Sequence, residues 1–156
     1  MKDPNRDPVA YEISEHPFLR GLSPGFLTSI SFGATSHTYA TDEFLLREGE
    51  TADHLFLIYS GKVALEVALP DRPRLTIETV GAGDVVGWSW SIAPRRYEHD
   101  ARALKPTRAI GIDAKVLRAA CEEDPSNGYQ FITRLLAVVA DRLANTRLQL
   151  VDQQRG

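Results

Sequence analysis

The chain has 156 residues, of which 43% are hydrophobic, and this length suits one compact domain with a buried core. Its 18 basic and 21 acidic side chains are interspersed and give a formal charge of -3. Such a surface lacks the extended positive field that holds a nucleic-acid backbone, so we expect no direct nucleic-acid partner.

We expect neither a secretion signal nor a membrane span from this sequence. No apolar core of a secretion signal is present in MKDPNRDPVAYEI, and no stretch of the chain reaches the ~18 apolar residues that a membrane span requires. We therefore expect a cytoplasmic protein without a membrane partner. Residues 1–11 are polar and contain two prolines, which predicts a flexible N-terminus ahead of a single domain over residues 12–156.

Short helices are expected before the main body of the domain. Apolar side chains recur at helical spacing in HPFLRGLSPGFLTSISFGA, which covers residues 16–34. Ser23 can cap a helix there, and Pro24 fits its first turn. We expect these helices to pack on a larger body.

Alternating residues predict that this body is made of strands. Val63, Leu65 and Val67 alternate with polar or small residues, and the same period returns at Leu75 and Ile77. Turn-forming residues separate the runs, among them Glu48-Gly49-Glu50, Ser60-Gly61, Pro70-Asp71-Arg72-Pro73 and Gly81-Ala82-Gly83-Asp84. The fold class predicted is mainly β with flanking helices, a double-stranded β-helix (jelly-roll) barrel.

Two helices are expected after the strands. Asp113 can cap a short helix that Asp124-Pro125 ends. A longer helix of about 25 residues, or roughly 38 Å, then follows. Its apolar stripe has heptad-like spacing and consists of Ile132, Leu136, Val139, Leu143, Thr146 and Leu150. Because this helix is longer than so small a domain can cover, we expect a homodimer through it; the alternative is that the stripe lies wholly on its own barrel.

Catalytic and metal-binding patterns are missing from the sequence. The single cysteine, Cys121, lies in an apolar helical pattern and is expected to pack, not react. The four histidines are scattered along the sequence, at His16, His37, His54 and His99. A metal-dependent cupin-type enzyme would need a closely spaced pair, so such an enzyme is kept only as an alternative. We expect no enzyme activity.

The order of these pieces resembles the cyclic nucleotide-binding domain of the Crp/Fnr superfamily. The resemblance runs from about His16 to Asn145 and rests on HPFLRGLSP, LLREGETADHLFLIYSGKVALE, GAGDVVG and DARAL. It implies a jelly-roll barrel that holds a nucleotide, such as cyclic AMP or cyclic GMP, and a long C-terminal helix that mediates dimerisation. Regulators of this superfamily continue into a DNA-binding module, whereas this sequence stops at Gly156, so we expect a free-standing regulatory, ligand-sensing module with an unidentified protein partner.

The resemblance implies a phosphate-binding cassette between Gly81 and Leu104, and its usual ligand-reading residues are replaced. Gly87 keeps its place, but Trp88 stands where the ribose-binding glutamate would be, and Tyr97 stands at the phosphate-binding arginine. An arginine fork is what a cyclic phosphate needs. The candidate ligand-binding residues are Gly87, Trp88, Ser89, Trp90, Arg95, Arg96 and Tyr97, together with Arg142 and Thr146 on the long helix.

Three readings of this cassette remain open. A one-residue slip could bring Arg96 to the phosphate. Alternatively, Trp88, Trp90 and Tyr97 line a pocket for another small molecule, or the tryptophans fill the barrel and the domain works as a ligand-independent dimerisation or interaction module. The resemblance implies that Arg142 and Thr146 match positions that reach the base side of the ligand. The alternatives are that Arg142 is a solvated charge and that Thr146 is an ordinary small residue of the helical stripe.

Asp100 is a second departure from the resemblance, because its position is usually small or hydroxylic. A buried carboxylate there would need a partner, for which Arg102 and Arg96 are the candidates.

Overall fold

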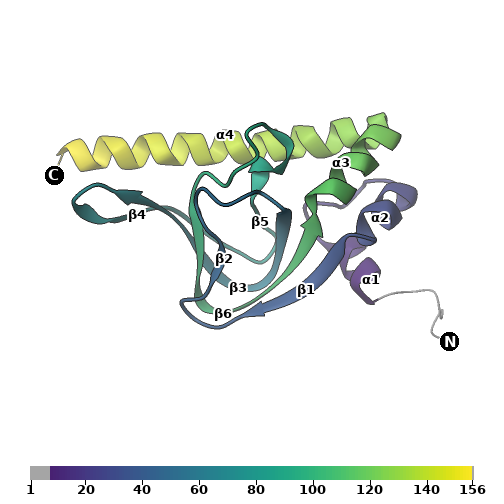
Figure 1. Ribbon diagram of the computed structural model, residues 1–156, viewed down its shortest axis with the longest axis horizontal. Helices are drawn as coiled ribbons and strands as arrows, with labels where there is room; N and C mark the ends of the chain where they lie inside the picture. The colour runs from purple at the N-terminus through teal and green to yellow at the C-terminus, as the bar shows by residue number, and fades with distance from the viewer. Residues whose placement is uncertain (1–7, 156) are drawn as a thin grey trace.

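The computed structural model describes residues 8–155, which form a β-barrel with helices at one end and along one side (Figure 1). Six strands form one sheet in the order β1-β6-β3-β4, with β2 also paired to β6 and β5 to β3. The strands are β1 (Ala34–Tyr39), β2 (Phe44–Leu46), β3 (His54–Leu69), β4 (Arg72–Gly81), β5 (Val85–Val86) and β6 (Asp100–Asp113). The antiparallel pairings and the barrel confirm the predicted fold class.

Two long strands, β3 and β6, span the whole barrel and pair with each other from His54 with Asp113 to Glu66 with Asp100. The turn predicted at Ser60-Gly61 was wrong, because β3 continues through it with irregular register. Gly61 has a φ of 105°, and a Cβ there would lie 2.2 Å from Oγ1 of Thr107 on β6. The glycine therefore serves a bulge that bends a continuous strand.

Four α-helices flank the barrel: α1 (Pro8–Glu15), α2 (Pro24–Ser31), α3 (Ala114–Glu123) and α4 (Pro125–Arg155). The two predicted caps are confirmed: Ser23 Oγ accepts a hydrogen bond from the Phe26 backbone N–H at 3.3 Å, and Asp113 Oδ1 accepts one from Lys115 at 2.8 Å. Helix α1 begins at Pro8, ahead of the predicted start of the domain at residue 12; the rest of the expected flexible N-terminus lies outside the described residues.

Helix α4 is longer than predicted, with 31 residues that extend over about 46 Å. It crosses one side of the barrel from α3 to beyond the tip of the β3–β4 hairpin (Figure 1). Phe131 and Leu135 are buried on its inner face, and Phe131 packs edge-on to Phe18 at 5.4 Å between ring centroids. The N-terminal helices and α4 are thus parts of one hydrophobic core with the barrel.

The predicted packing role of Cys121 agrees with its surroundings. The residue is half-buried on α3, and burial raises the pKa of its thiol to about 11. Almost none of the reactive thiolate exists at neutral pH, which fits a structural cysteine.

Candidate functional site

A pocket of about 460 Å³ lies between the barrel, the cassette and α4, and we call it the α4 pocket. The residues that line it are Leu65 and Val67 of β3, Ile77 of β4, Trp88, Glu98 and His99 of the cassette, and Val139, Arg142, Leu143 and Thr146 of α4. Its size is in the range of small-molecule sites.

The strand period places the apolar walls of this pocket. Leu65 and Val67 lie two residues apart on β3 and so face the same side of the sheet. Helix α4 supplies the opposite wall, because Val139, Leu143 and Thr146 are spaced by four and three residues and share one helical face. Any molecule that fills the pocket would therefore touch both the barrel and α4.

Gly87 starts the cassette and directs Trp88 to the pocket. It has a φ of 91° and precedes the 3₁₀ helix η1 (Trp88–Ser91). A Cβ at this position would lie 3.0 Å from His54 O and 3.2 Å from a ring carbon of Tyr97. The backbone conformation and the close approach both require glycine.

The three aromatic residues of the cassette go to three different places. Trp88 is half-buried and lines the α4 pocket. Trp90 is fully buried, and its ring meets Phe131 of α4 edge-on, with centroids 5.9 Å apart. Its carbonyl oxygen accepts a hydrogen bond from Arg118 of α3 at 2.8 Å. Only Trp88 therefore has a position from which it could meet a pocket ligand, whereas Trp90 joins the cassette to the helices.

Tyr97 is buried and fixed by backbone groups at the start of β3. Its hydroxyl donates a hydrogen bond to His54 O at 2.9 Å and accepts one from His54 N–H at 3.1 Å. Burial raises the pKa of Tyr97 to about 12, so the hydroxyl keeps its proton at neutral pH. Tyr97 is not among the residues that line the α4 pocket. Its ligand role stays a prediction, and the geometry gives it a structural task.

The two cassette arginines lie on the surface. Arg96 is exposed, and its guanidinium donates a hydrogen bond to Gly49 O at 2.9 Å. Arg95 is also exposed and has a φ of 58°, while the neighbouring candidate Ser89 is buried within η1. Neither arginine is among the residues that line the α4 pocket. A one-residue slip that brings Arg96 to a phosphate finds no support in this arrangement.

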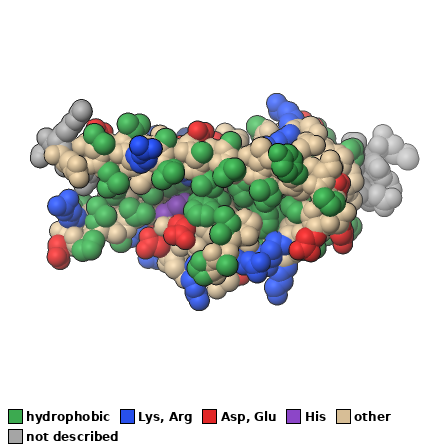
Figure 2. All heavy atoms as spheres, turned by 90° about the horizontal axis from the view of Figure 1, so that it is seen from above, with side chains coloured by type: hydrophobic (Ala, Val, Ile, Leu, Met, Phe, Trp, Pro, Cys, Tyr) green, Lys and Arg blue, Asp and Glu red, His purple; other side chains and the backbone are tan. Residues whose placement is uncertain are grey.

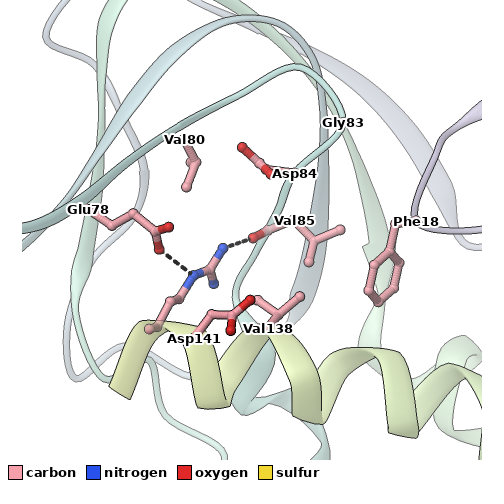
Figure 3. A pocket seen from close by; sticks show the side chains of 9 residues that line it. Phe18, Glu78, Val80, Gly83, Asp84, Val85, Val138 and Asp141 are labelled. Atoms are coloured by element: carbon pink, nitrogen blue, oxygen red, sulfur yellow. Dashed lines mark hydrogen bonds and ion pairs between the residues drawn. The ribbon is translucent and has the colours of Figure 1, made fainter. Parts of the chain in front are cut away.

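Arg142 is buried where α4 crosses the barrel, and it lines both the α4 pocket and a smaller pocket of about 110 Å³. Figure 3 shows the smaller pocket, with Glu78, Asp84 and Val85 around it. The Arg142 guanidinium donates a hydrogen bond to Val85 O, and its Nε lies 3.4 Å from a carboxylate oxygen of Glu78. Asp84 and Asp141 also line the smaller pocket. Burial lowers the pKa of Arg142, and the nearby carboxylates of Glu78 and Asp84 oppose that shift. Arg142 is thus an interior cation paired with Glu78, not a solvated charge, and within residues 8–155 its buried Nη1 has no hydrogen-bond partner.

The remaining polar residues of the α4 pocket are Thr146, His99 and Glu98. Thr146 Oγ1 donates to Arg142 O at 2.8 Å. His99 is buried, and its Nδ1 lies 3.1 Å from Asp100 O, so Nδ1 carries the proton. Burial, and secondarily Arg142, lower the pKa of His99 to about 4, which leaves the ring uncharged at neutral pH.

The partners predicted for Asp100 were wrong. Its carboxylate pairs with Arg74 on β4 and lies 3.8 Å from Arg47, and it accepts a hydrogen bond from the Glu48 backbone N–H at 2.7 Å. Arg102 instead pairs with Glu66 at 2.9 Å. Asp100 is not among the residues that line the α4 pocket.

Sequence reasoning identified residues of this site at the start of the cassette and on α4, and it missed those at the end of the cassette. Gly87, Trp88, Arg142 and Thr146 were candidates, and all lie at or beside the α4 pocket. Glu98 and His99 were not; the only signal was that they directly precede β6, where a cassette ends.

Neither a metal centre nor a membrane span is evident in residues 8–155. No group of three or more His, Cys, Asp or Glu side chains there could hold a metal ion. No helix in that range is both long enough and apolar enough to cross a bilayer.

Two curated proteins that the chain resembles are longer than the chain itself. It is 30% identical over 142 residues to Glutaminase 1 of Bradyrhizobium diazoefficiens, a match that covers 90% of this chain and 22% of that protein. It is 26% identical over 133 residues to the CRP-like cAMP-activated global transcriptional regulator of Mycobacterium tuberculosis, covering 85% of this chain and 58% of the regulator. The chain thus spans less than two thirds of each relative.

Solved structures share the fold. A protein from Geobacter metallireducens, named for cyclic nucleotide binding, matches with a TM-score of 0.75 and 27% identity over 86% of this chain and 97% of its own. A cyclic nucleotide-binding domain from Methylobacillus flagellatus matches with a TM-score of 0.77 and 23% identity over 92% and 83% of the two chains. The profile of the cyclic nucleotide-binding domain family matches residues 36–124, more than half of the sequence. The chain therefore belongs to the family of cyclic nucleotide-binding domains.

Proposed function

We propose that this chain is a non-catalytic regulatory module that senses a small molecule in the α4 pocket. The observation that carries the proposal is the composition of the pocket walls, which come from β3, β4, the cassette and α4 together. A ligand in contact with all of these would bias the position of α4 against the barrel, provided that it binds one position better than another. In this proposal residues 12–156 act as one domain, in the cytoplasm and without direct contact to nucleic acid.

The proposed roles follow the geometry of each residue. Trp88 offers an aromatic face, and Gly87 sets its direction. Thr146 and the stem of Arg142 lie on the α4 side of the pocket, so they would report occupancy to the helix. Ser89, Trp90, Arg95, Arg96 and Tyr97 would act indirectly, by holding the cassette in place.

Ligand titration with two readouts tests this function. Cyclic AMP, cyclic GMP and a panel of uncharged metabolites are titrated in a thermal-shift assay, because a ligand that binds the folded state raises its apparent stability. Hydrogen exchange is then measured over α4 with any ligand that binds. We expect altered protection around Val139 to Thr146; exchange over α4 that is indifferent to a bound ligand would contradict the proposed coupling.

We further propose a homodimer through the exposed apolar stripe of α4, which borders the α4 pocket at Leu143. Four apolar residues of this stripe are exposed, namely Ile132 (39%), Leu136 (64%), Leu143 (60%) and Leu150 (53%). Figure 2 looks onto the side of the molecule that carries α4 and shows hydrophobic side chains gathered along it. A contiguous apolar surface of this kind is typical of an interface.

Light scattering after size exclusion tests the dimer. Leu136→Glu should give the mass of a monomer at concentrations where the unmodified chain gives that of a dimer. Ala137→Glu is the matched control, because Ala137 is exposed on the same helix but faces away from the stripe, roughly 100° around the helix from Leu136. A monomer mass for the unmodified chain at high micromolar concentration would contradict the interface.

A second candidate function is a ligand-independent interaction module. Two observations favour it. Tyr97, which the resemblance aligns with the phosphate-binding arginine, is held by the backbone of His54. Arg142 joins α4 to the barrel through Val85 O and Glu78. No thermal shift with any ligand, combined with a stable dimer, would favour this candidate over the sensor.

A further inference from the structure

The residues around the α4 pocket limit the chemical class of its ligand, an inference that rests on the sensing function proposed above. Six of the ten residues that line the pocket are apolar: Leu65, Val67, Ile77, Trp88, Val139 and Leu143. Burial of an apolar ligand surface against these walls stabilises the complex. The Trp88 ring also offers a face on which a flat, aromatic ligand can stack.

The charged residues of the pocket do not favour an anion. Arg142, the one cation among the residues that line the pocket, forms an ion pair with Glu78 and donates from Nη2 to Val85 O, while its buried Nη1 has no hydrogen-bond partner among the described residues. Glu98 contributes a carboxylate, which would repel a phosphate or a carboxylate ligand. The cassette arginines that could compensate are exposed elsewhere. An anion would therefore meet a cation whose charge Glu78 already offsets, together with the repelling carboxylate of Glu98.

The uncharged polar groups of the pocket are left as hydrogen-bond acceptors. His99 donates through Nδ1 to Asp100 O, so its Nε2 carries the lone pair. The Thr146 hydroxyl donates its proton to Arg142 O, so its oxygen lone pairs are left to accept hydrogen bonds from a ligand. Glu98 is an acceptor as well when it is ionised. A matching ligand would supply N–H or O–H donors to these atoms, and an uncharged carbonyl oxygen on it could accept from the unpartnered Nη1 of Arg142.

We infer that the α4 pocket takes an uncharged, largely aromatic small molecule that carries N–H or O–H donors, and that it discriminates against phosphate and carboxylate anions. Four observations carry this inference together: the apolar walls, the Trp88 face, the internal pairing of Arg142, and the acceptor character of His99 and Thr146.

The test uses two probes on one ring system, measured by isothermal titration calorimetry against the full chain. 2-Naphthamide is uncharged and carries an N–H₂ donor, whereas 2-naphthoate has nearly the same shape and a negative charge. We expect 2-naphthamide to bind at least roughly tenfold more tightly than 2-naphthoate or cyclic AMP. Glu98→Gln should narrow that gap by strengthening 2-naphthoate binding, an effect that a merely structural role of this exposed residue would not produce.

A matched pair of variants locates the binding. Thr146 and Thr133 both lie on α4, and each donates its hydroxyl proton to the carbonyl four residues earlier at 2.8 Å, but only Thr146 lines the pocket. Thr146→Trp should abolish 2-naphthamide binding by filling the pocket, and Thr133→Trp should leave it unchanged. Binding that survives Thr146→Trp would overturn the inference.

The outcomes separate this inference from the sensing function. If 2-naphthoate or cyclic AMP binds at the Thr146-sensitive site as tightly as 2-naphthamide, the uncharged-ligand inference fails and the sensor stands. If 2-naphthamide, 2-naphthoate, cyclic AMP and cyclic GMP all fail to bind at millimolar concentration, both fail, and the ligand-independent candidate takes their place.

Discussion

Tyr97→Phe tests whether the residue at the expected phosphate position is structural. The substitution removes only the hydroxyl and so breaks two hydrogen bonds to the backbone of His54, at 2.9 and 3.1 Å. Each net hydrogen bond contributes about 1 kcal/mol, so the free energy of unfolding should fall by about 2 kcal/mol. For a domain of this size the melting temperature should fall by about 4–8 °C.

Urea unfolding followed by tryptophan fluorescence measures this change, with Tyr129→Phe as the matched control. Tyr129 is 75% exposed, so its variant should stay within about 0.5 kcal/mol of the original chain. Because the buried ring that supports the cassette is kept in Tyr97→Phe, affinity for any ligand of the α4 pocket should change by less than about twofold. Full stability combined with weakened ligand binding would refute the structural role and return Tyr97 to the ligand site.

Two further predictions concern pH and the cassette turn. Because the pKa of His99 is about 4 in the folded chain against about 6.5 unfolded, the unfolded state binds more protons between these values, and stability should fall by about 3 kcal/mol as the pH drops through this window. His99→Gln should remove that part of the loss in urea titrations at pH 7.5 and 4.5; an unchanged pH dependence would contradict the burial of His99. Gly87→Ala should lower stability by more than about 1 kcal/mol, since its φ is 91° and its Cβ site is crowded, whereas Gly25→Ala in α2, with open space around it, should raise stability by about 0.4–1 kcal/mol. Calorimetric melting temperatures that move in the same direction for both variants would count against this reasoning.

Local patterns predicted the elements of this fold well. The caps at Ser23 and Asp113, the alternation in β3 and the stripe on α4 are all encoded by residues a few positions apart. The spacing of strands and turns also predicted the barrel, and the family resemblance added the place of the cassette. The bend at Gly61 was misread because a glycine that permits a turn equally permits a bulge, and only pairing with β6 distinguishes the two.

The candidate site was less predictable because its contacts join distant segments. The Tyr97 hydroxyl meets His54, 43 residues away, and Asp100 selects Arg74 on another strand over the nearer Arg102. Trp88 and Trp90 look alike in the sequence, yet one lines a pocket and the other packs on Phe131. Which partner a side chain meets depends on strand register, and no local period fixes that.

The buried Arg142 has a consequence for how much work a ligand could do. Helix α4 is fastened to the barrel by bonds within the chain, to Val85 O and Glu78, so part of the energy that holds the helix is independent of the pocket contents. A ligand can shift a two-state equilibrium only by the difference between its affinities for the two states. In the proposed sensor, stronger bonds between α4 and the barrel therefore demand a larger affinity difference before α4 moves, so Arg142 would set the threshold of the response.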